Sequence, residues 1–181
     1  MSNKKNNIVL VGFMGTGKSV VGRRLAKILK REFIDTDKII EERAGKSISE
    51  IFSDEGEIHF RNLEADVIKD ISDKKNCVIV TGGGAVIRDE NINNLKKEGI
   101  IICLKALPEV IYKRVRYDIK RPLLQTENPL KKIKELLEYR EKYYEKADCF
   151  IDTSKMTVEK IVEEVLRVGE VNVKYQSSKS K

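Results

Sequence analysis

The feature that most constrains this chain is the segment GFMGTGKS at residues 12–19, which fits the pattern G-x-x-x-x-G-K-[ST] without a mismatch. An apolar, strand-like run at 8–11 precedes it, and a segment with helical apolar spacing at 20–31 follows it. The glycines of such a loop let backbone N–H groups curl around a phosphate chain, and the following helix directs its positive end at the same anions. The sequence therefore predicts a phosphate-binding loop (P-loop). In it, Lys18 would reach the β- and γ-phosphates of a nucleotide, and the Ser19 hydroxyl would bind Mg²⁺.

The chain length of 181 residues favours one domain with one core. We place this domain at residues 1–170 and expect the polar segment 171–181 to be a disordered tail. No apolar run approaches the roughly 18 residues of a membrane span, and the polar start of the chain does not resemble a secretion signal. The sequence therefore predicts a cytoplasmic protein with no membrane partner.

The net charge of +7 raises the question of a nucleic-acid partner. Five of the positive charges lie near the two ends of the chain, on Lys4, Lys5, Lys174, Lys179 and Lys181. Basic tails more often aid solubility than recognition, so we expect no nucleic-acid partner. An odd number of cysteines without C-x-x-C spacing argues against a disulfide framework or a zinc site and favours buried thiols at Cys77, Cys103 and Cys149.

Strand-like and helix-like segments alternate along the chain, which predicts an α/β fold. The expected strands are residues 8–11, 32–34, 77–81, 100–104 and 149–151. The expected helices are 20–31, 38–43, a short one after a capping box at 47–50, 57–72, 109–117, 130–146 and 158–168. Thr36 or Asp37 is expected to cap the second helix, and Gly169 to end the last one. The strands are short and apolar with little alternation, as in a parallel sheet covered by helices on both faces.

Candidate site residues follow two further strands, at the sheet edge where parallel sheets bind ligands. Of the carboxylates Asp35 and Asp37, one could hold the water shell of Mg²⁺ and the other could accept a hydrogen bond from an acceptor hydroxyl. The alternative role for Asp37 is helix capping. The triple glycine 82–84 leaves its backbone open to a ligand, or is only a flexible turn. It stands where many P-loop proteins carry a metal-binding aspartate, so Asp35 is our candidate for the metal carboxylate.

Three arginines are candidates for binding anions. Arg61 and Arg140 could each hold a carboxylate with two hydrogen bonds, although a solvated surface arginine is the default for each alone. The segment 118–129, bracketed by prolines, reads as a mobile lid that could bring Arg121 onto a transferring phosphoryl group. A plain connecting loop is the alternative.

Taken together, these motifs resemble the shikimate kinases, small P-loop kinases of the nucleoside-monophosphate-kinase type. The matching elements occur in the family's order: the P-loop, Asp35-Thr36-Asp37, Phe60-Arg61 with Glu64, the triple glycine 82–84, RPLL at 121–124, and Tyr139-Arg140 followed by Tyr143. The P-loop alone is shared with many NTPases, whereas the whole set is far more selective.

The resemblance implies a five-stranded parallel sheet in the order 2-3-1-4-5 and ATP-dependent phosphorylation of the 3-hydroxyl of shikimate, a step of aromatic amino acid biosynthesis. The enzyme would be a monomer that uses ATP and Mg²⁺. The implied catalytic residues are Lys18, Asp37 and Arg121, and the implied metal site is Ser19 with Asp35 through water. The implied shikimate site consists of Asp37, Arg61, Gly82, Gly83, Gly84 and Arg140. The implied nucleotide site consists of Gly15, Thr16, Gly17, Lys18, Ser19, Val20, Arg114, Arg121, Asp152 and Thr153, with Arg114 and the last two near adenine.

Other functions fit parts of this pattern. Another small-molecule kinase of the same fold, such as a gluconate or nucleoside-monophosphate kinase, would share the P-loop, because P-loop scaffolds change acceptors readily. A nucleotide-binding switch without a small acceptor, or a regulator that binds shikimate without turnover, would also keep the loop. The two arginines and the triple glycine argue against another acceptor. The intact Lys18, Ser19 and Asp37 argue against a loss of catalysis.

Overall fold

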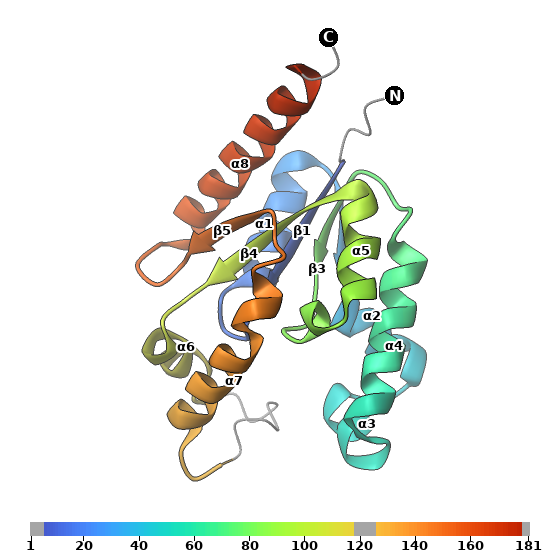
Figure 1. Cartoon of the computed structure of the whole chain (residues 1–181), viewed down its shortest axis with the longest axis vertical. Coiled ribbons are helices and arrows are strands. Elements are labelled where there is room, and N and C mark those ends of the chain that lie inside the picture. Colours follow the sequence, from blue (N-terminus) through green and yellow to red (C-terminus); the bar gives the residue numbers. More distant parts are fainter. Residues whose placement is uncertain (1–5, 118–125, 179–181) are drawn as a thin grey trace.

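The computed structural model describes residues 6–117 and 126–178, in which strands and helices alternate (Figure 1). The strands are β1 (Asn7–Gly12), β2 (Glu32–Asp35), β3 (Cys77–Val80), β4 (Gly99–Lys105) and β5 (Cys149–Asp152). The helices are α1 (Lys18–Leu29), α2 (Thr36–Ala44), α3 (Ile48–Asp54), α4 (Gly56–Ile71), α5 (Asp89–Glu98), α6 (Pro108–Val115), α7 (Pro129–Tyr144) and α8 (Val158–Ser178), with a 3₁₀ helix η1 (Ala85–Ile87) before α5. All five predicted strands are confirmed, each to within one residue at either end.

The strands form one parallel sheet in the order β2-β3-β1-β4-β5, which confirms the predicted fold class and strand order. Strand β1 lies in the middle, where Ile8 is in register with Val78 of β3 and with Ile100 of β4. Since all strands run the same way, the loops that follow β1, β2 and β3 leave the sheet at one edge. This topology brings the P-loop, the Asp35–Asp37 segment and the triple glycine together.

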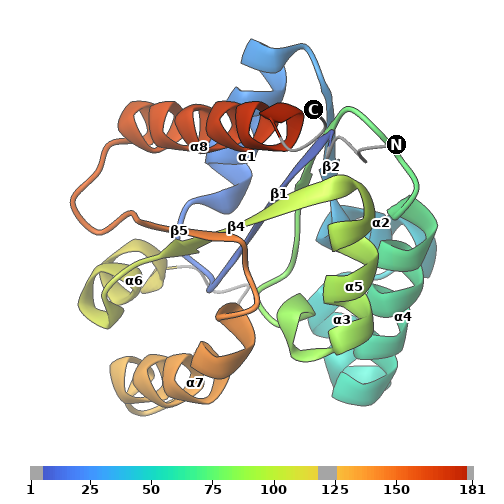
Figure 2. The same cartoon turned by 45° about the horizontal axis from the view of Figure 1, so that its top comes forward.

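Helices cover both faces of the sheet, and the side chains of each central strand alternate between the two layers. In β1, Val9 and Val11 pack with residues of α4, α5, α6 and α7, whereas Ile8 and Leu10 pack with residues of α1 and α8. Figure 2 shows α1 and α8 together on one side of the sheet and α5 and α7 on the other. Burial on both faces explains why the strands read as unbroken apolar runs.

A smaller apolar cluster joins α2, α3 and α4 around Ile40, Ile51 and Phe60. The predicted capping box is confirmed at α3, because the Ser47 hydroxyl accepts from the N–H of Glu50 and the Glu50 carboxylate accepts from the N–H of Ser47. The predicted cap of α2 is wrong. The helix begins at Thr36, so Thr36 and Asp37 lie in its first turn, and no side chain caps it.

One helix was not predicted from the sequence. Helix α5 has only two apolar residues on its buried side, Ile92 and Leu95, and it buries Asn91 and Asn94 beside them. The amide nitrogen of Asn91 donates to the carbonyl of Ala85 at 3.0 Å, so η1 provides a partner for the N–H of a side chain that sequence patterns assign to the surface.

Two expectations concern the ends of segments. The tail expected to be disordered from residue 171 is helical as far as Ser178, because α8 continues through Gly169. No proline follows Gly169, and a lone glycine inside a helix costs only about 1 kcal/mol. Residues 179–181, and the centre of the predicted lid at 118–125 with Arg121, lie outside the described residues.

Two further observations bear on the class of protein. No helix among residues 6–117 and 126–178 is long and apolar enough to cross a membrane. The three cysteines are free, with Cys77 and Cys103 fully buried and Cys149 partly buried. The expectation of buried thiols is therefore confirmed for Cys77 and Cys103 and wrong for Cys149.

Candidate active site

Three glycines give the loop between β1 and α1 its shape. Gly12, Gly15 and Gly17 have φ angles of 139°, 75° and 97°, a region that other residues rarely adopt. A Cβ on Gly12 would lie only 2.3 Å from the carbonyl oxygen of Leu104, so no side chain fits where the loop leaves the sheet. Helix α1 begins at Lys18 without a side-chain cap, which leaves its first N–H groups directed at the space that the loop encloses.

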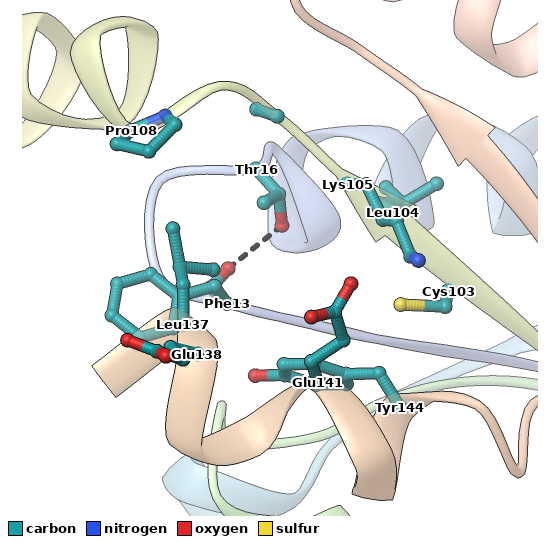
Figure 3. Close-up of a pocket in the computed structure, with 11 residues that line it drawn as sticks. Phe13, Thr16, Cys103, Leu104, Lys105, Pro108, Leu137, Glu138, Glu141 and Tyr144 are labelled. Atoms are coloured by element: carbon teal, nitrogen blue, oxygen red, sulfur yellow. Dashed lines mark hydrogen bonds between the residues drawn. The ribbon is translucent and has the colours of Figure 1, made fainter. Parts of the chain in front are cut away.

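The Lys18 side chain is folded back across this loop. Its Nζ donates to the carbonyl oxygens of Gly12 at 2.8 Å and Phe13 at 2.9 Å, and the side chain is buried. The Thr16 hydroxyl donates to the same Phe13 oxygen at 2.7 Å (Figure 3). The loop thus holds a positive charge and a helix N-terminus in one place, which is the arrangement that binds a phosphate chain.

Two carboxylates meet beside the triple glycine. A Cβ on Gly82 would lie 2.7 Å from Asp37 Oδ1 and 3.0 Å from Glu64 Oε1. Both oxygens are buried, and neither has a hydrogen-bond partner among the described residues. An unpartnered buried acceptor is costly, so this pair points to a ligand whose hydroxyl groups would supply the missing donors.

The surroundings of Asp37 raise the pKa of its carboxyl group toward neutral pH. Burial, together with the nearby carboxylates of Glu64 and Asp35, raises the pKa of Asp37 to about 7, against the opposing positive charges of Lys18 and Arg61. Burial also raises the pKa of Glu64, against the effect of three neighbouring arginines. A carboxyl group that titrates near pH 7 can exchange a proton with a substrate hydroxyl, which is typical of a general base.

Arg61 lies on the triple glycine and is held there by two glutamates. Its Nη1 donates to Glu64 Oε2 at 2.8 Å, and its Nη2 donates to Glu57 Oε1 at 3.1 Å. A Cβ on Gly84 would lie 2.3 Å from Arg61 Nη2, so the guanidinium occupies the place of a side chain at position 84. The solvated surface role considered for Arg61 is therefore wrong, since its side chain is 11% exposed.

Arg140 is also buried, with 4% exposure, and it approaches the triple glycine from α7. Its guanidinium lies over the Phe13 ring, 5.5 Å from the centroid, and a Cβ on Gly83 would be 3.5 Å from its Nη1. The Nε is buried and has no partner among the described residues. A buried guanidinium with a spare donor is suited to bind an anion such as a carboxylate.

Tyr144 is a residue of this site that sequence reasoning missed. Its hydroxyl donates to the carbonyl of Gly83 at 2.7 Å, and its side chain is buried, which raises its pKa. The resemblance drew attention to Tyr143, which instead packs against Tyr139 at 5.7 Å between ring centroids. The two tyrosines are adjacent in the sequence, and they have different contacts because successive residues lie on different faces of α7.

We expect Tyr144→Phe to weaken acceptor binding through the backbone of Gly83. The loss of one hydrogen bond of about 1 kcal/mol should raise the acceptor KM roughly fivefold and leave the ATP KM unchanged. Tyr143→Phe is the matched control and should change neither constant. Steady-state kinetics on both variants checks this, and equal effects of the two changes would contradict a role for the Gly83 contact.

The remaining residues expected to bind the nucleotide are Arg114, Asp152 and Thr153, expected near adenine, and Val20 after the P-loop. Arg114 and Thr153 contact each other, with Arg114 Nη2 donating to the Thr153 carbonyl at 2.8 Å. Asp152 is exposed and accepts a hydrogen bond from the N–H of Ser154 at 2.8 Å. Val20 is 53% exposed on the first turn of α1.

The donors expected for Mg²⁺ stand at the ends of two elements. Ser19 lies in the first turn of α1, and Asp35 is the last residue of β2. No group of three or more His, Cys, Asp or Glu side chains suited to a metal occurs among residues 6–117 and 126–178. A hydroxyl and one carboxylate still fit Mg²⁺, which takes few protein ligands and keeps water and phosphate oxygens.

A cavity of about 330 Å³ lies next to the P-loop, between the end of β4 and helix α7. Its described lining is mainly apolar and includes Phe13 and Leu137, with Lys105, Glu138 and Glu141 as its charged members (Figure 3). The lining also includes Tyr144, whose hydroxyl donates to the carbonyl of Gly83, and the Phe13 ring contacts the Arg140 guanidinium. The cavity therefore borders the triple-glycine site, although Asp37, Arg61 and Arg140 are not among its lining residues.

Comparison with known proteins points to the same family that the sequence motifs resemble. The shikimate kinase family model matches residues 14–170. The shikimate kinase of Thermodesulfovibrio yellowstonii is 53% identical over 161 residues, which are 89% of this chain and 93% of that relative. A solved shikimate kinase from Acinetobacter baumannii in complex with shikimate has a TM-score of 0.89 at 40% identity, over 94% of this chain and 96% of that chain. A gluconokinase from Sinorhizobium meliloti has a TM-score of 0.63 at 17% identity over 99% of both chains, a likeness of fold alone.

Proposed function

Because this chain belongs to the shikimate kinase family, we propose that it transfers the γ-phosphoryl group of ATP to the 3-hydroxyl of shikimate and forms shikimate 3-phosphate. One observation carries the proposal: Asp37, Arg61 and Arg140 converge on the triple glycine, at the sheet edge that also bears the P-loop. The acceptor site therefore combines a carboxylate for hydroxyl groups with two arginines for an anion, and it adjoins the phosphate site.

The acceptor would be oriented by these three side chains. Arg61 and Arg140 would hold the carboxylate of shikimate, with the Gly82–Gly84 backbone close to the ring because no side chain intervenes. The unpartnered Nε of Arg140 and Oδ1 of Asp37 provide the donor and the acceptor that such a ligand needs. Asp37 would accept the hydrogen bond of the reacting hydroxyl and take its proton as the phosphoryl group is transferred.

The nucleotide would lie along the P-loop. Backbone N–H groups from Gly15 to Val20 and the ammonium of Lys18 would hold its phosphates, and Arg114 with the Asp152–Thr153 segment would lie on the adenine side. Shikimate kinases use ATP with Mg²⁺, and the metal neutralises charge on the phosphate oxygens. Ser19 would bind Mg²⁺ directly and Asp35 through water. Arg121 would meet the transferring group from the segment 118–129.

Release of ADP from Mg·ATP tests this function. We expect a large stimulation by shikimate and none by gluconate, CMP or AMP at the same concentrations. Stimulation by one of the other acceptors would leave the P-loop chemistry in place and remove the proposed acceptor. If ATP binds and no acceptor stimulates ADP release, the protein acts as a nucleotide-binding switch or as a regulator that binds shikimate without turnover.

Arg140 gives a more specific prediction. Arg140→Ala should raise the KM for shikimate roughly 10- to 100-fold, because it removes charge-assisted hydrogen bonds of about 1.5–3 kcal/mol. The KM for ATP should stay within about twofold of the wild-type value. Lys142→Ala, on the exposed side of the same helix, is the matched control. A comparable rise in both KM values would indicate a folding defect rather than loss of an acceptor contact.

We propose that the protein works as a cytoplasmic monomer without a nucleic-acid partner. In support, the described groups of both proposed sites belong to one chain, and the reaction consumes ATP, which the cytoplasm supplies. The mass in solution, measured by light scattering, tests whether the protein is a monomer. Retention on DNA or RNA columns that falls steeply with salt would contradict the absence of a nucleic-acid partner.

A further inference from the structure

The Arg114 side chain joins three parts of the chain that are far apart in the sequence. From α6, its Nη1 donates to the P-loop carbonyl of Gly15 at 3.1 Å. The same Nη1 lies 3.1 Å from the Thr153 hydroxyl, and Nη2 donates to the Thr153 carbonyl at 2.8 Å. The guanidinium therefore links the phosphate-binding loop to the segment that follows β5.

Thr153 is a rigid anchor for this link. It is fully buried, and both its N–H and its hydroxyl donate to the carbonyl of Lys105, at 2.8 and 3.0 Å. A hydroxyl has one hydrogen, which is used here, so its remaining lone pairs can only accept. The direction of the hydrogen bond from Arg114 to the hydroxyl is thereby fixed.

Helix α6 holds Gly15 on two sides. Gly15 has a φ of 75°, and a Cβ there would lie 2.7 Å from Val115 Cγ1, so Val115 packs against the α-carbon while Arg114 holds the carbonyl. In a trans peptide, the carbonyl of one residue and the N–H of the next point in opposite directions. With the Gly15 carbonyl turned toward Arg114, the N–H of Thr16 must point the other way.

That N–H points into the loop. It lies 3.4 Å from the Phe13 oxygen, which also accepts a hydrogen bond from Lys18 Nζ at 2.9 Å. A bond as long as 3.4 Å is weak, so the N–H can turn to a phosphate oxygen that enters beside the ammonium. The Gly15–Thr16 peptide could nevertheless flip by rotation about ψ of Gly15 and φ of Thr16, because Gly15 has no Cβ to oppose the rotation on its side. The flipped peptide would direct a carbonyl oxygen at the phosphate chain and repel it.

We propose that Arg114 is a positioning residue that prevents this flip. It would support phosphate binding through the Gly15 carbonyl, independently of any contact with adenine. The proposal rests on the proposed function only in that the P-loop binds the phosphates of the donor.

Inorganic tripolyphosphate separates the two roles of Arg114, since it has phosphates but neither base nor ribose. Calorimetry on the full chain gives its Kd and that of ATP. We expect Arg114→Ala to weaken both ligands by a similar factor of about 10, the effect of one lost charge-assisted contact. Lys113→Ala, which removes the same charge from the neighbouring exposed position, should have a much smaller effect.

A second pair of variants leaves the charge unchanged. Thr153→Val removes the hydroxyl and should weaken tripolyphosphate roughly threefold, whereas Thr153→Ser keeps the hydroxyl and should bind it nearly as the wild type does. Thermal unfolding shows whether each variant is folded. If Arg114→Ala does not fold, the comparison of the two Thr153 variants still tests the proposal.

Two results would overturn the proposal. In one, Arg114→Ala weakens ATP but changes tripolyphosphate no more than Lys113→Ala does, so that the arginine meets only the nucleoside. In the other, Thr153→Val binds tripolyphosphate like the wild type, so that the anchor has no effect on the loop. Failure of the proposed function itself would appear separately, as wild-type protein that binds tripolyphosphate but shows no shikimate-dependent release of ADP.

Discussion

Replacement of Lys18 by alanine is expected to lower kcat for shikimate phosphorylation by about 10³-fold, the loss that follows removal of one preorganised group from a transition state. The ammonium is buried inside the P-loop, 2.8 and 2.9 Å from two carbonyl oxygens. Charge grows on the phosphate oxygens during transfer, and a fixed cation in that position stabilises it without reorganisation. Coupled detection of ADP at saturating shikimate measures the effect.

Two controls separate this effect from a change in the loop. Lys27→Ala removes an exposed lysine from the last turn of the same helix and should leave kcat unchanged. Lys18→Met keeps most of the side-chain volume and should be as inactive as Lys18→Ala. A Lys18→Met enzyme with wild-type kcat would exclude the ammonium from the reaction.

Asp37→Asn is expected to have an effect of similar size. Removal of a general base lowers kcat by about 10³-fold, whereas the Kd of ATP should be nearly unchanged, because Asp37 lies beside the triple glycine rather than in the P-loop. Asp66→Asn makes the same chemical change at an exposed position of α4 and is the matched control. Wild-type turnover in Asp37→Asn would remove this carboxylate from the mechanism.

The same substitution has a second expected result, in stability. The pKa of Asp37 is raised to about 7 in the folded protein from an ordinary value near 4. The folded state therefore binds the proton more tightly than the unfolded chain, and stability falls as pH rises from about 4 to about 7. We expect Asp37→Asn to unfold at a higher temperature than the wild type at pH 8. The difference should shrink toward pH 4, and a difference independent of pH would contradict the raised pKa.

The parts of the fold that were predictable have local causes. Each strand is an apolar run that ends at a turn residue, and the P-loop combines glycine spacing with the strand and helix around it. Helix α5 was missed because its buried asparagines depend on a partner in η1 that no periodicity displays. The end of α8 was missed because a single glycine was given too much weight as a stop signal.

The site was predictable where a motif fixes the residue type. The chemistry of Lys18 follows from the P-loop pattern, whereas burial decides the state of Arg61 and Arg140, and burial is a property of the folded chain. Glu64 was noted only as part of a motif, and its contacts with Asp37 and Arg61 appear once α4 packs beside the triple glycine. Tyr144 reaches Gly83 across 61 positions of sequence, which no local pattern encodes. The role of Arg121 stays a prediction.

The contact between Gly84 and Arg61 also limits how this enzyme could evolve. Every other amino acid at position 84 carries a Cβ, which would collide with the guanidinium at 2.3 Å. A larger residue at position 84 would therefore move Arg61, so a change of acceptor that begins at this glycine also alters the group proposed to hold the substrate carboxylate. The same coupling bears on drug resistance, because a substitution at Gly84 that excludes a tightly fitting compound would also displace Arg61 from the triple glycine.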